Sequence, residues 1–177
     1  MFSLNIYQER RQRLKELMPE KSLAIVAAAA EVIRNRDAEY PFRQSSDFWY
    51  LTGLTEPDAV LVIGPGQPDR LFVRPKHPEQ EVWTGRRMGP DHVKPRLGID
   101  QGYPLEALDT ELKTLLAEIA WVEYPFGCQK STAIVDQAIK AKGLRSRRSD
   151  FLSHRADLSR HLSQARLIKS RQEIDIM

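Results

Sequence analysis

The chain has 177 residues, a net charge of +3 and 41% hydrophobic residues, which fits one domain with a core of its own. A single cysteine beside 9 glycines and 11 prolines excludes the disulfide-rich and collagen-like classes. No apolar run approaches the ~18 residues that a membrane span requires.

The first quarter of the chain predicts a helix followed by a buried strand. Residues 4–18 place apolar side chains on one stripe among charged neighbours, and Pro19 ends the pattern. Residues 22–29 form a continuous apolar run, which is typical of a strand covered on both faces. The charged stretch 31–46 is too long for a tight turn, and such loops in compact domains are more often functional than not.

The middle of the chain predicts strands joined by short turns. Apolar runs indicate strands over residues 47–52, 59–63, 70–74 and 82–84. Trp49 lies within the first of these runs and is predicted to belong to the core. The turn-forming residues 64–69 predict a hairpin between the second and third of these strands.

The second half of the chain predicts helices alternating with a strand. Apolar spacing predicts helices over residues 90–97, 105–119, 131–142 and 158–164. Gly98 and Gly143 supply the stop signals of the first and third helix, and a strand is predicted over 121–124. The complete pattern predicts an α/β fold, with a mixed β-sheet flanked by helices.

A helix start lies close to the end of the sequence. Residues 170–173 form a capping box, with Ser170 as the cap and Glu173 three residues later. A helix of fewer than two turns is not stable alone, so we expect the chain from Ser170 onward to be mobile or held only by packing contacts. We also expect the chain to be a piece of a longer protein, cut just inside its next domain.

The residues alone indicate no complete catalytic apparatus. The four histidines lack the spacing of zinc ligands, and no P-loop, GxSxG or GxGxxG motif occurs. Asp37, Glu39 and Asp47 are interleaved with arginines, which favours an ion-pair network or an interface over a divalent-metal site. We interpret Cys128 as a small apolar loop residue, because no histidine is near it in the sequence. The sequence therefore predicts no catalytic residue, metal site or cofactor site in this chain.

A basic segment gives the alternative function. From Lys140 to Arg171 the chain carries ten Lys or Arg against two Asp, a local charge of +8. Such a segment would suit a stand-alone binding module that uses residues 140–171 for an acidic protein or nucleic acid. No nucleic-acid-binding motif accompanies it, so we predict no nucleic-acid partner. The lone cysteine and the lack of an export signal predict a cytoplasmic protein without a membrane partner.

Several motifs resemble one known family in order and spacing. The most distinctive is RNRDAEYPFRQSSDFWYLTG at residues 34–53. The others are EPDAVLV at 56–62, EVWTGRRMG at 81–89, KPRLGID at 94–100 and RLIKSRQEI at 166–174. Together these motifs resemble the N-terminal domain of bacterial aminopeptidase P, the Xaa-Pro aminopeptidases.

The resemblance implies a creatinase-like N-terminal domain over residues 1–165. Residues 166–177 would then be the linker and first turns of a C-terminal catalytic "pita-bread" domain. In the family that domain holds two Mn²⁺ ions on Asp, His and Glu ligands, and it removes the residue that precedes proline from a peptide. These ligands would all lie beyond Met177, so the longer parent is expected to be a metallo-aminopeptidase and this piece to be inactive alone. A dipeptidase, or a relative without metal ligands, remains a further alternative.

The resemblance also implies roles for the N-terminal domain. These are to contact its own catalytic domain, to build a homo-oligomer (a dimer or tetramer), and to close the substrate cleft of a neighbouring subunit over a proline-containing peptide. Trp83 matches the family's tryptophan beside Gly85 and is the candidate that stacks on a prolyl ring; the alternative for Trp83 is an ordinary core position. Asp37 and Arg145 are weaker candidates for cleft contacts, and their alternative is a surface ion pair.

Overall fold

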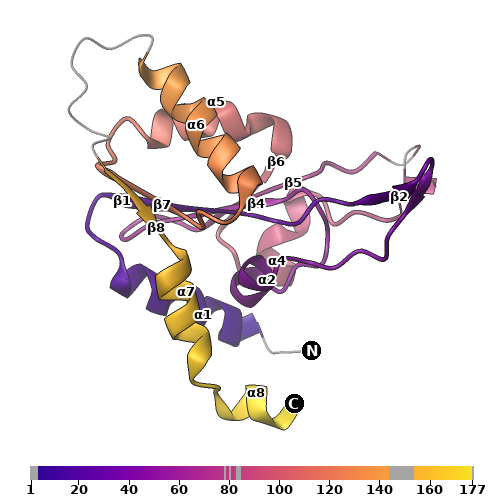
Figure 1. The fold of residues 1–177 in the computed structure, drawn as a ribbon, viewed down its shortest axis with the longest axis horizontal. Coiled ribbons are helices and arrows are strands. Elements are labelled where there is room, and N and C mark those ends of the chain that lie inside the picture. The colour runs from indigo at the N-terminus through magenta and orange to yellow at the C-terminus, as the bar shows by residue number, and fades with distance from the viewer. Residues whose placement is uncertain (1–3, 78, 80, 83–84, 144–153, 177) are drawn as a thin grey trace.

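The computed structural model describes residues 4–77, 79, 81–82, 85–143 and 154–176. A six-stranded mixed sheet forms the centre of the molecule, with strand order β6-β5-β4-β1-β7-β8 (Figure 1). The strands are β1 (Ser22–Ala27), β4 (Val60–Ile63), β5 (Arg70–Val73), β6 (Gln101–Pro104), β7 (Trp121–Tyr124) and β8 (His154–Asp157). β4 runs antiparallel to both β1 and β5, whereas β6, β7 and β8 each run parallel to the strand beside them.

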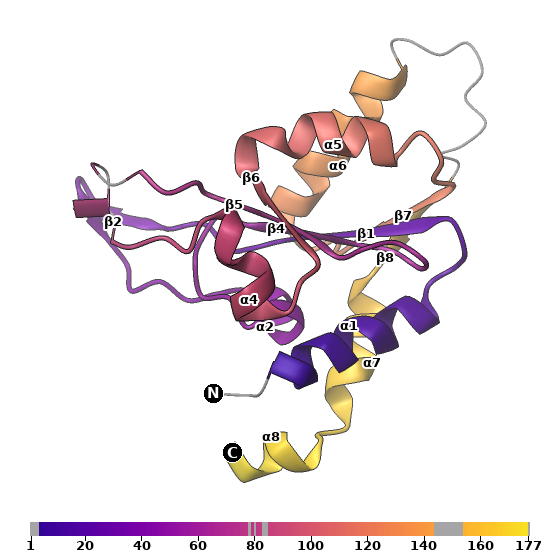
Figure 2. The same ribbon diagram turned by 180° about the vertical axis from the view of Figure 1, so that it is seen from behind.

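Helices cover both faces of this sheet, as the views from the front and from behind show (Figures 1 and 2). One face packs against α1 (Leu4–Leu17), α2 (Ser46–Thr52), α4 (Val93–Leu97) and α7 (Ser159–Leu167). The other face packs against α5 (Leu108–Leu115) and α6 (Gln129–Gly143). Short 3₁₀ turns, η1 (Pro90–His92) and η2 (Leu105–Ala107), precede α4 and α5, and α8 (Arg171–Ile176) follows α7. The predicted α/β architecture is therefore confirmed.

Strand β1 lies between the two hydrophobic cores. All six of its residues are buried, and alternate side chains enter opposite cores, with Ala24 and Val26 on the α1 side and Leu23 and Ile25 on the α5–α6 side. This two-sided burial explains why the sequence shows a continuous apolar run there and not an alternating pattern. At the end of the strand, the Ala27 amide donates to Ser131 Oγ at 3.1 Å, which ties α6 to the sheet.

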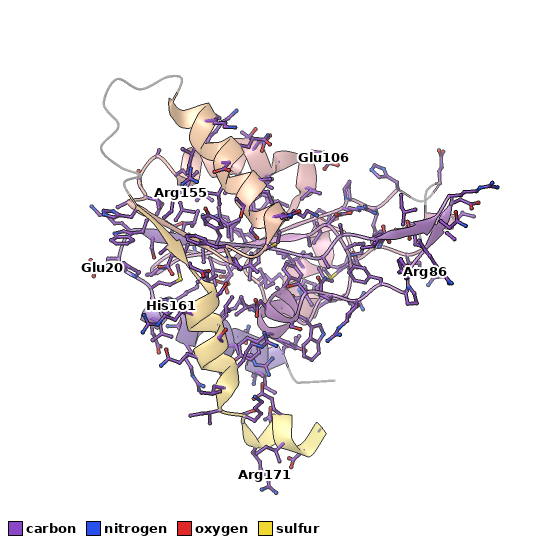
Figure 3. All side chains as sticks on the ribbon, in the orientation of Figure 1. Glu20, Arg86, Glu106, Arg155, His161 and Arg171 are labelled. Carbon is purple, nitrogen blue, oxygen red and sulfur yellow. The ribbon has the colours of Figure 1, made fainter. Side chains whose placement is uncertain are left out.

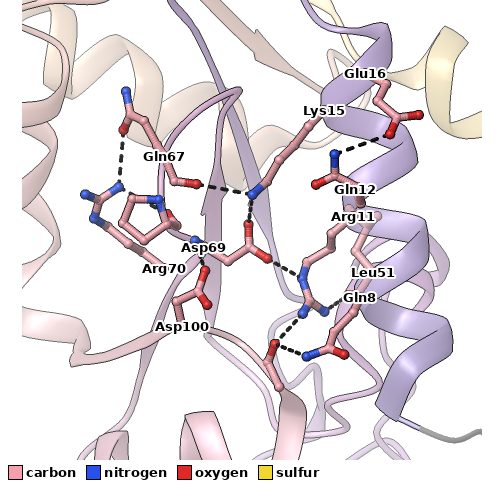
Figure 4. Close-up of polar contacts among 12 residues, drawn as sticks. Gln8, Arg11, Gln12, Lys15, Glu16, Leu51, Gln67, Asp69, Arg70 and Asp100 are labelled. Atoms are coloured by element: carbon pink, nitrogen blue, oxygen red, sulfur yellow. Dashed lines mark hydrogen bonds and ion pairs between the residues drawn. The ribbon is translucent and has the colours of Figure 1, made fainter.

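A buried guanidinium holds the α1 side of the molecule together (Figure 4). The side chain of Arg11 on α1 is 1% exposed, and its Nε donates to Asp69 Oδ2 at 2.7 Å. Its two terminal nitrogens donate to the carbonyl oxygens of Leu51 and Gly98, at 2.8 and 2.7 Å. Lys15 also pairs with Asp69, at 2.6 Å. One helix is thus joined to α2, to the end of α4 and to the turn between β4 and β5.

The prediction of a strand at residues 47–52 is wrong, because this segment is the helix α2. Asp47 stands in its first turn, where a negative charge favours the helix, and Gly53 ends it in the left-handed conformation with φ +70°. The residue Gly53 also allows close packing, since a Cβ there would lie 2.6 Å from the Tyr7 ring. The aromatic run favoured a strand by propensity, but packing of Phe48 and Leu51 against α1 and the sheet overrides that preference.

Trp49 is not a core residue, contrary to its predicted place. It is 36% exposed and meets Tyr7 edge to face, with ring centroids 6.1 Å apart. On a helix its side chain points about 100° away from that of Phe48, so a helical turn takes it out of the core that a strand would have offered.

The remaining predicted elements are confirmed with three differences. The strand predicted at 82–84 is wrong at Val82, which has helical backbone, while residues 83 and 84 lie outside the described part of the chain. The helix predicted at 105–119 begins as a 3₁₀ turn and ends at Leu115. Strands β6 and β8 carried no strand signal because they are edge strands with mostly exposed or half-buried residues, and their place comes from pairing with β5 and β7.

A second buried ionisable group lies on β7. Glu123 is 1% exposed and its Oε2 is 3.5 Å from Nδ1 of His161 on α7, which Figure 3 labels. Burial raises the pKa of Glu123, and the nearby His161 offsets only part of that effect. The native protein therefore holds this carboxyl proton more tightly than the unfolded chain does.

Replacing Arg11 with Met is expected to lower the free energy of unfolding by roughly 3–5 kcal/mol. The change leaves the buried Leu51 carbonyl oxygen without its donor, removes one of the two donors to the Gly98 carbonyl oxygen, and removes one of the two cations at Asp69. Urea unfolding measures the loss. Arg13→Met, on the exposed side of the same helix, is the control and should change stability by about 0.5 kcal/mol or less. Equal losses in the two variants would contradict the assignment.

The raised pKa of Glu123 predicts a particular pH dependence. Because the native state binds the extra proton, the stability of the wild-type protein should fall as the pH rises from the ordinary carboxyl range through the raised pKa. Glu123→Gln should lack this part of the slope and gain stability relative to wild type over that range. Urea unfolding at several pH values between 4 and 7 tests this, with the exposed Glu118→Gln as control. A slope that is the same in wild type and Glu123→Gln would refute the prediction.

Candidate functional site

A thin arm extends beyond one end of the sheet (Figure 1). Its tip is a hairpin of β2 (Ile33–Asn35) and β3 (Ala38–Glu39), which form a separate two-stranded sheet. The two strands are joined by Arg36 and Asp37, and Arg36 adopts a positive φ of 50°. Asp37 is thus exposed at the turn of the arm. The sequence suggested only a long loop here, since strands this short carry no pattern of their own.

Hydrogen bonds between the side chains of Gln44 and Glu56 and nearby backbone groups hold the base of the arm against the body. Gln44 accepts a hydrogen bond from the Ala29 amide and donates one to the Glu56 carbonyl oxygen, both at 2.8 Å. The Glu56 carboxylate in turn accepts from the Met88 amide at 2.7 Å. Two side chains therefore join four segments of the chain, around residues 29, 44, 56 and 88.

Charged side chains reinforce the same base. Asp58 lies between Arg74 and Lys130 and pairs with both. Burial acts to raise the pKa of Asp58, but the hydrogen bonds and positive charges of Lys130 and Arg74 outweigh it and hold the pKa below its usual value. Glu31 lies 3.6 Å from Arg74 and 3.5 Å from Arg87. The predicted network of Asp37, Glu39 and Asp47 with the arginines interleaved among them does not form among the described residues. The ion pairs at the base use other side chains, and Asp47 pairs with Arg166 of α7.

The structure describes one of the three predicted cleft residues. Asp37 is at the tip of the arm, and among the described residues it has no ion-pair partner. Trp83 and Arg145 lie outside the described residues. Glu81 and Arg87, on either side of Trp83 in sequence, are joined by a hydrogen bond from the Arg87 amide, and Arg87 also contacts Glu31 at the arm's base. The C-terminal end of α6, which precedes Arg145, lies far from the arm in both views (Figures 1 and 2).

The arm and the turn beside it expose several large apolar side chains. These are Val32 at 60%, Ile33 at 67%, Tyr40 at 54% and Val82 at 80% of their full surface. Exposed apolar side chains that gather on one projection are typical of a surface that meets another molecule.

A second candidate surface lies where α7 turns into α8. The predicted capping box forms: the Ser170 amide donates to Glu173 Oε2 at 2.7 Å, and the Glu173 amide donates to Ser170 Oγ at 3.3 Å. Glu173 also pairs with Arg10 of α1 at 2.7 Å, and Arg10 lies over the Tyr50 ring, 4.1 Å from its centroid. The Tyr50 hydroxyl donates to the Ala165 carbonyl oxygen at 3.2 Å.

The expectation that only packing holds the last residues is therefore wrong for Glu173. Burial acts to raise the pKa of Glu173, but the Ser170 hydrogen bonds and the charge of Arg10 outweigh it and lower the pKa. The capping box was visible in the sequence. Its partner was not, because Arg10 is 163 residues away and lies on another helix.

A groove of about 830 Å³ opens beside this junction, between α2 and the end of α7. Its α2 side is formed by Phe42, Arg43, Trp49 and Tyr50, and its α7–α8 side by Ser163, Arg166, Leu167, Lys169 and Glu173. Arg166 pairs with Asp47 of α2 at 2.6 Å, which joins the end of α7 to α2. Sequence reasoning missed this groove because it assigned Trp49 to a strand in the core.

Neither surface has the ligands of a metal site. Among residues 4–77, 79, 81–82, 85–143 and 154–176, no three His, Cys, Asp or Glu side chains gather closely enough to hold a metal ion. Over the same ranges no helix is long and apolar enough to cross a membrane. In the basic segment, the described Arg155 and Arg166 are paired with Asp136 and Asp47, so part of its charge is already neutralised within the domain.

Comparison with known proteins places the chain in a family. Residues 7–121 match the family described as Aminopeptidase P, N-terminal domain. The Xaa-Pro aminopeptidase of Escherichia coli K12 is 34% identical over 177 residues, which cover 97% of this chain and 40% of that protein. The chain thus spans about two fifths of the length of this relative.

Solved structures agree with the sequence match. The low-pH form of E. coli aminopeptidase P superimposes with a TM-score of 0.93 and 35% identity, over 99% of this chain and 41% of that one. A zinc-substituted E. coli aminopeptidase P in complex with product gives a TM-score of 0.92 and 36% identity, with the same coverage. Both similarities extend through the junction of α7 and α8, since they cover nearly the whole chain.

The Arg10–Glu173 pair is expected to stabilise α8 locally. Glu173→Gln preserves the capping box but removes the charge, so the amides of residues 170–176 should exchange about tenfold faster, which corresponds to about 1.5 kcal/mol. Asp175→Asn removes the exposed pair with Arg171 in the same helix and is the matched control, with an expected effect of about 0.5 kcal/mol or less. Hydrogen exchange followed by mass spectrometry measures both. Unchanged exchange in Glu173→Gln would show that the pair contributes nothing.

Proposed function

The chain belongs to the aminopeptidase P family, whose N-terminal domain it carries, and from this membership we propose that it is the non-catalytic domain of an Xaa-Pro aminopeptidase. The longer parent would hydrolyse the bond between an N-terminal residue and a following proline. The observation that carries the proposal is the match to the E. coli enzyme, which is close in both sequence and structure over nearly the whole chain.

The proposed division of the chain follows from its junction. Residues 1–165 would form the N-terminal domain, and residues 166–177 the linker and first turns of the catalytic domain. The contacts of this linker support the division, because Arg166 and Glu173 tie its two ends back to α2 and α1. These two ion pairs hold the linker against the N-terminal domain.

The metal chemistry belongs to the part of the parent that follows. The described residues do not fit a metal site, so no step of hydrolysis is assigned to them. One matched E. coli enzyme is zinc-substituted, which supports a metal-dependent parent. We propose two Mn²⁺ ions in its catalytic domain, as the family resemblance implies.

The proposed roles of this domain are oligomerisation and closure of a substrate cleft in a neighbouring subunit. The arm suits such contacts, because it projects from the body, exposes apolar side chains and is fixed at its base by Gln44, Glu56 and Asp58. Trp83, Asp37 and Arg145 are the proposed cleft residues.

The full-length protein should hydrolyse an Xaa-Pro peptide and should lose that activity on dialysis against a chelator, with recovery when Mn²⁺ is added. In the same protein, Trp83→Ala should lower kcat/KM ten- to a hundredfold, because a stacked indole contributes about 1.5–3 kcal/mol of buried apolar contact. Its Tm should stay within about 2 °C of wild type, since a residue at a cleft adds little to the fold.

Phe126→Ala is the control, because it removes an aromatic side chain that is 49% exposed and does not belong to the arm or to the turn beside it. It should leave both kcat/KM and Tm nearly unchanged. A Trp83→Ala variant that melts much earlier, with normal kcat/KM for each folded molecule, would make Trp83 a core residue and remove it from the cleft.

A further inference from the structure

The contact between Glu123 and His161 joins the central sheet to α7. On β7, the neighbouring residues Val122 and Tyr124 enter the core on the α5–α6 side, so the side chain of Glu123 is directed to the opposite face. Glu123 is 1% exposed there, and its Oε2 lies 3.5 Å from Nδ1 of His161. His161 belongs to the first half of α7, as Figure 3 shows. A buried carboxyl of the sheet thus faces a single imidazole of the helix that covers it.

The two facing atoms of this contact are buried without a hydrogen bond. Glu123 Oε2 and His161 Nδ1 are shielded from solvent, and neither makes a hydrogen bond to any residue that the structure describes. An ionised carboxylate in such a place loses its hydration without a full replacement, whereas a protonated carboxyl is neutral and costs far less to bury. Close packing of α7 over Glu123 therefore favours the protonated form of this carboxyl.

The other charged and titratable side chains around α7 have partners elsewhere or are exposed. The paired ones are Arg155 with Asp136, Arg11 and Lys15 with Asp69, Arg10 with Glu173, and Arg166 with Asp47. The exposed ones are Glu9, Arg13, Glu16, Glu20, Lys21, His154, Asp157 and Arg160. The side chain of His161 is itself 30% exposed, so water screens its charge and it offsets only part of the cost of ionising Glu123.

The start of α7 lies at one edge of the sheet and depends on local contacts. Leu158 and Leu162 carry its apolar contacts with the core. The hydrogen bond from the Tyr50 hydroxyl to the Ala165 carbonyl oxygen holds the helix about one turn further on. A helix held in this way beside the edge strand β8 can open locally while the rest of the domain stays folded.

We propose that the Glu123 carboxyl is a proton-controlled latch for the first half of α7. With the carboxyl protonated, α7 packs closely over β7. With the carboxyl ionised, the first half of α7 separates transiently from β7 and admits water to the carboxylate. The latch opens as the pH rises, because the closed state is the one that binds the proton more tightly; the raised pKa of Glu123, caused by burial, agrees with this direction. The device goes beyond the proposed function and does not depend on it.

Hydrogen exchange in the full-length protein tests the latch. Mass spectrometry measures the protection of the α7 amides, relative to the intrinsic exchange rate at each pH, between about pH 4.5 and 7.5. In the wild type we expect the protection of residues 161–165 to fall about tenfold over this range, while that of α1 changes by about threefold or less. Glu123→Gln keeps the shape of the side chain but cannot ionise, so it should abolish the fall in α7.

Two further variants identify the group that titrates. His161→Gln retains the buried carboxyl, so the fall should persist, and Glu118→Gln, at an exposed position, should behave as the wild type does. A fall that disappears in His161→Gln, or persists in Glu123→Gln, would overturn the proposal, because the buried carboxyl would then not control α7. Protection of α7 that is independent of pH in the wild type would also overturn it. So would an equal fall in α1, since the whole domain would then be loosening.

Discussion

The arrangement of this domain depends on one buried guanidinium. Arg11 stands on the inner side of α1 and satisfies a carboxylate and two carbonyl oxygens that belong to three other segments. Neutral apolar contacts could hold α1 against the sheet at several angles, since they have no direction. Hydrogen bonds from a planar guanidinium have fixed directions, so they select one position of α1 relative to α2 and α4.

That position determines where the two candidate surfaces lie. Arg10 directly precedes Arg11 on α1. With α1 in place, Arg10 donates to the Tyr50 carbonyl oxygen at 3.0 Å and pairs with Glu173. The α2 helix that Arg11 fixes at Leu51 also carries Trp49 and Tyr50, which line one side of the groove. The arm follows β1 and ends just before α2, where Gln44 anchors it. Two adjacent arginines thus connect the body, the arm and the junction to the next domain.

The division of work between the two surfaces follows from their chemistry. The arm is held at its base by polar contacts, exposes Val32, Ile33 and Tyr40 among charged residues, and lies far from α8. The junction is apolar on its outer side and held by ion pairs on its inner side. In the proposed function, the arm contacts other subunits and the junction contacts the catalytic domain of the same chain. The N-terminal domain would then fix the position of that catalytic domain relative to the neighbouring subunits.

The sequence by itself determined the α/β class, most of the elements and the family. The buried strand β1, the hairpin of β4 and β5 and the helix stop at Gly98 follow from periodicity and turn chemistry, which are local. The capping box of α8 was also readable, because its two residues are three apart. Local signals succeeded wherever the partner of a residue lies within a few positions of it.

Only the tertiary structure decided that residues 46–52 form a helix and not a strand, and which partners the charged residues meet. The run DFWYLT has the propensity of a strand, but contacts with α1 and the sheet make it a helix and bring Trp49 to the surface. Edge strands β6 and β8 form because a neighbouring strand offers them hydrogen bonds. Arg11 with Asp69, and Arg10 with Glu173, are 58 and 163 residues apart, and charge alone does not reveal which of 24 acidic residues each arginine meets. Pairing over such distances is set by the packed chain, because burial makes one geometry far more favourable than all others.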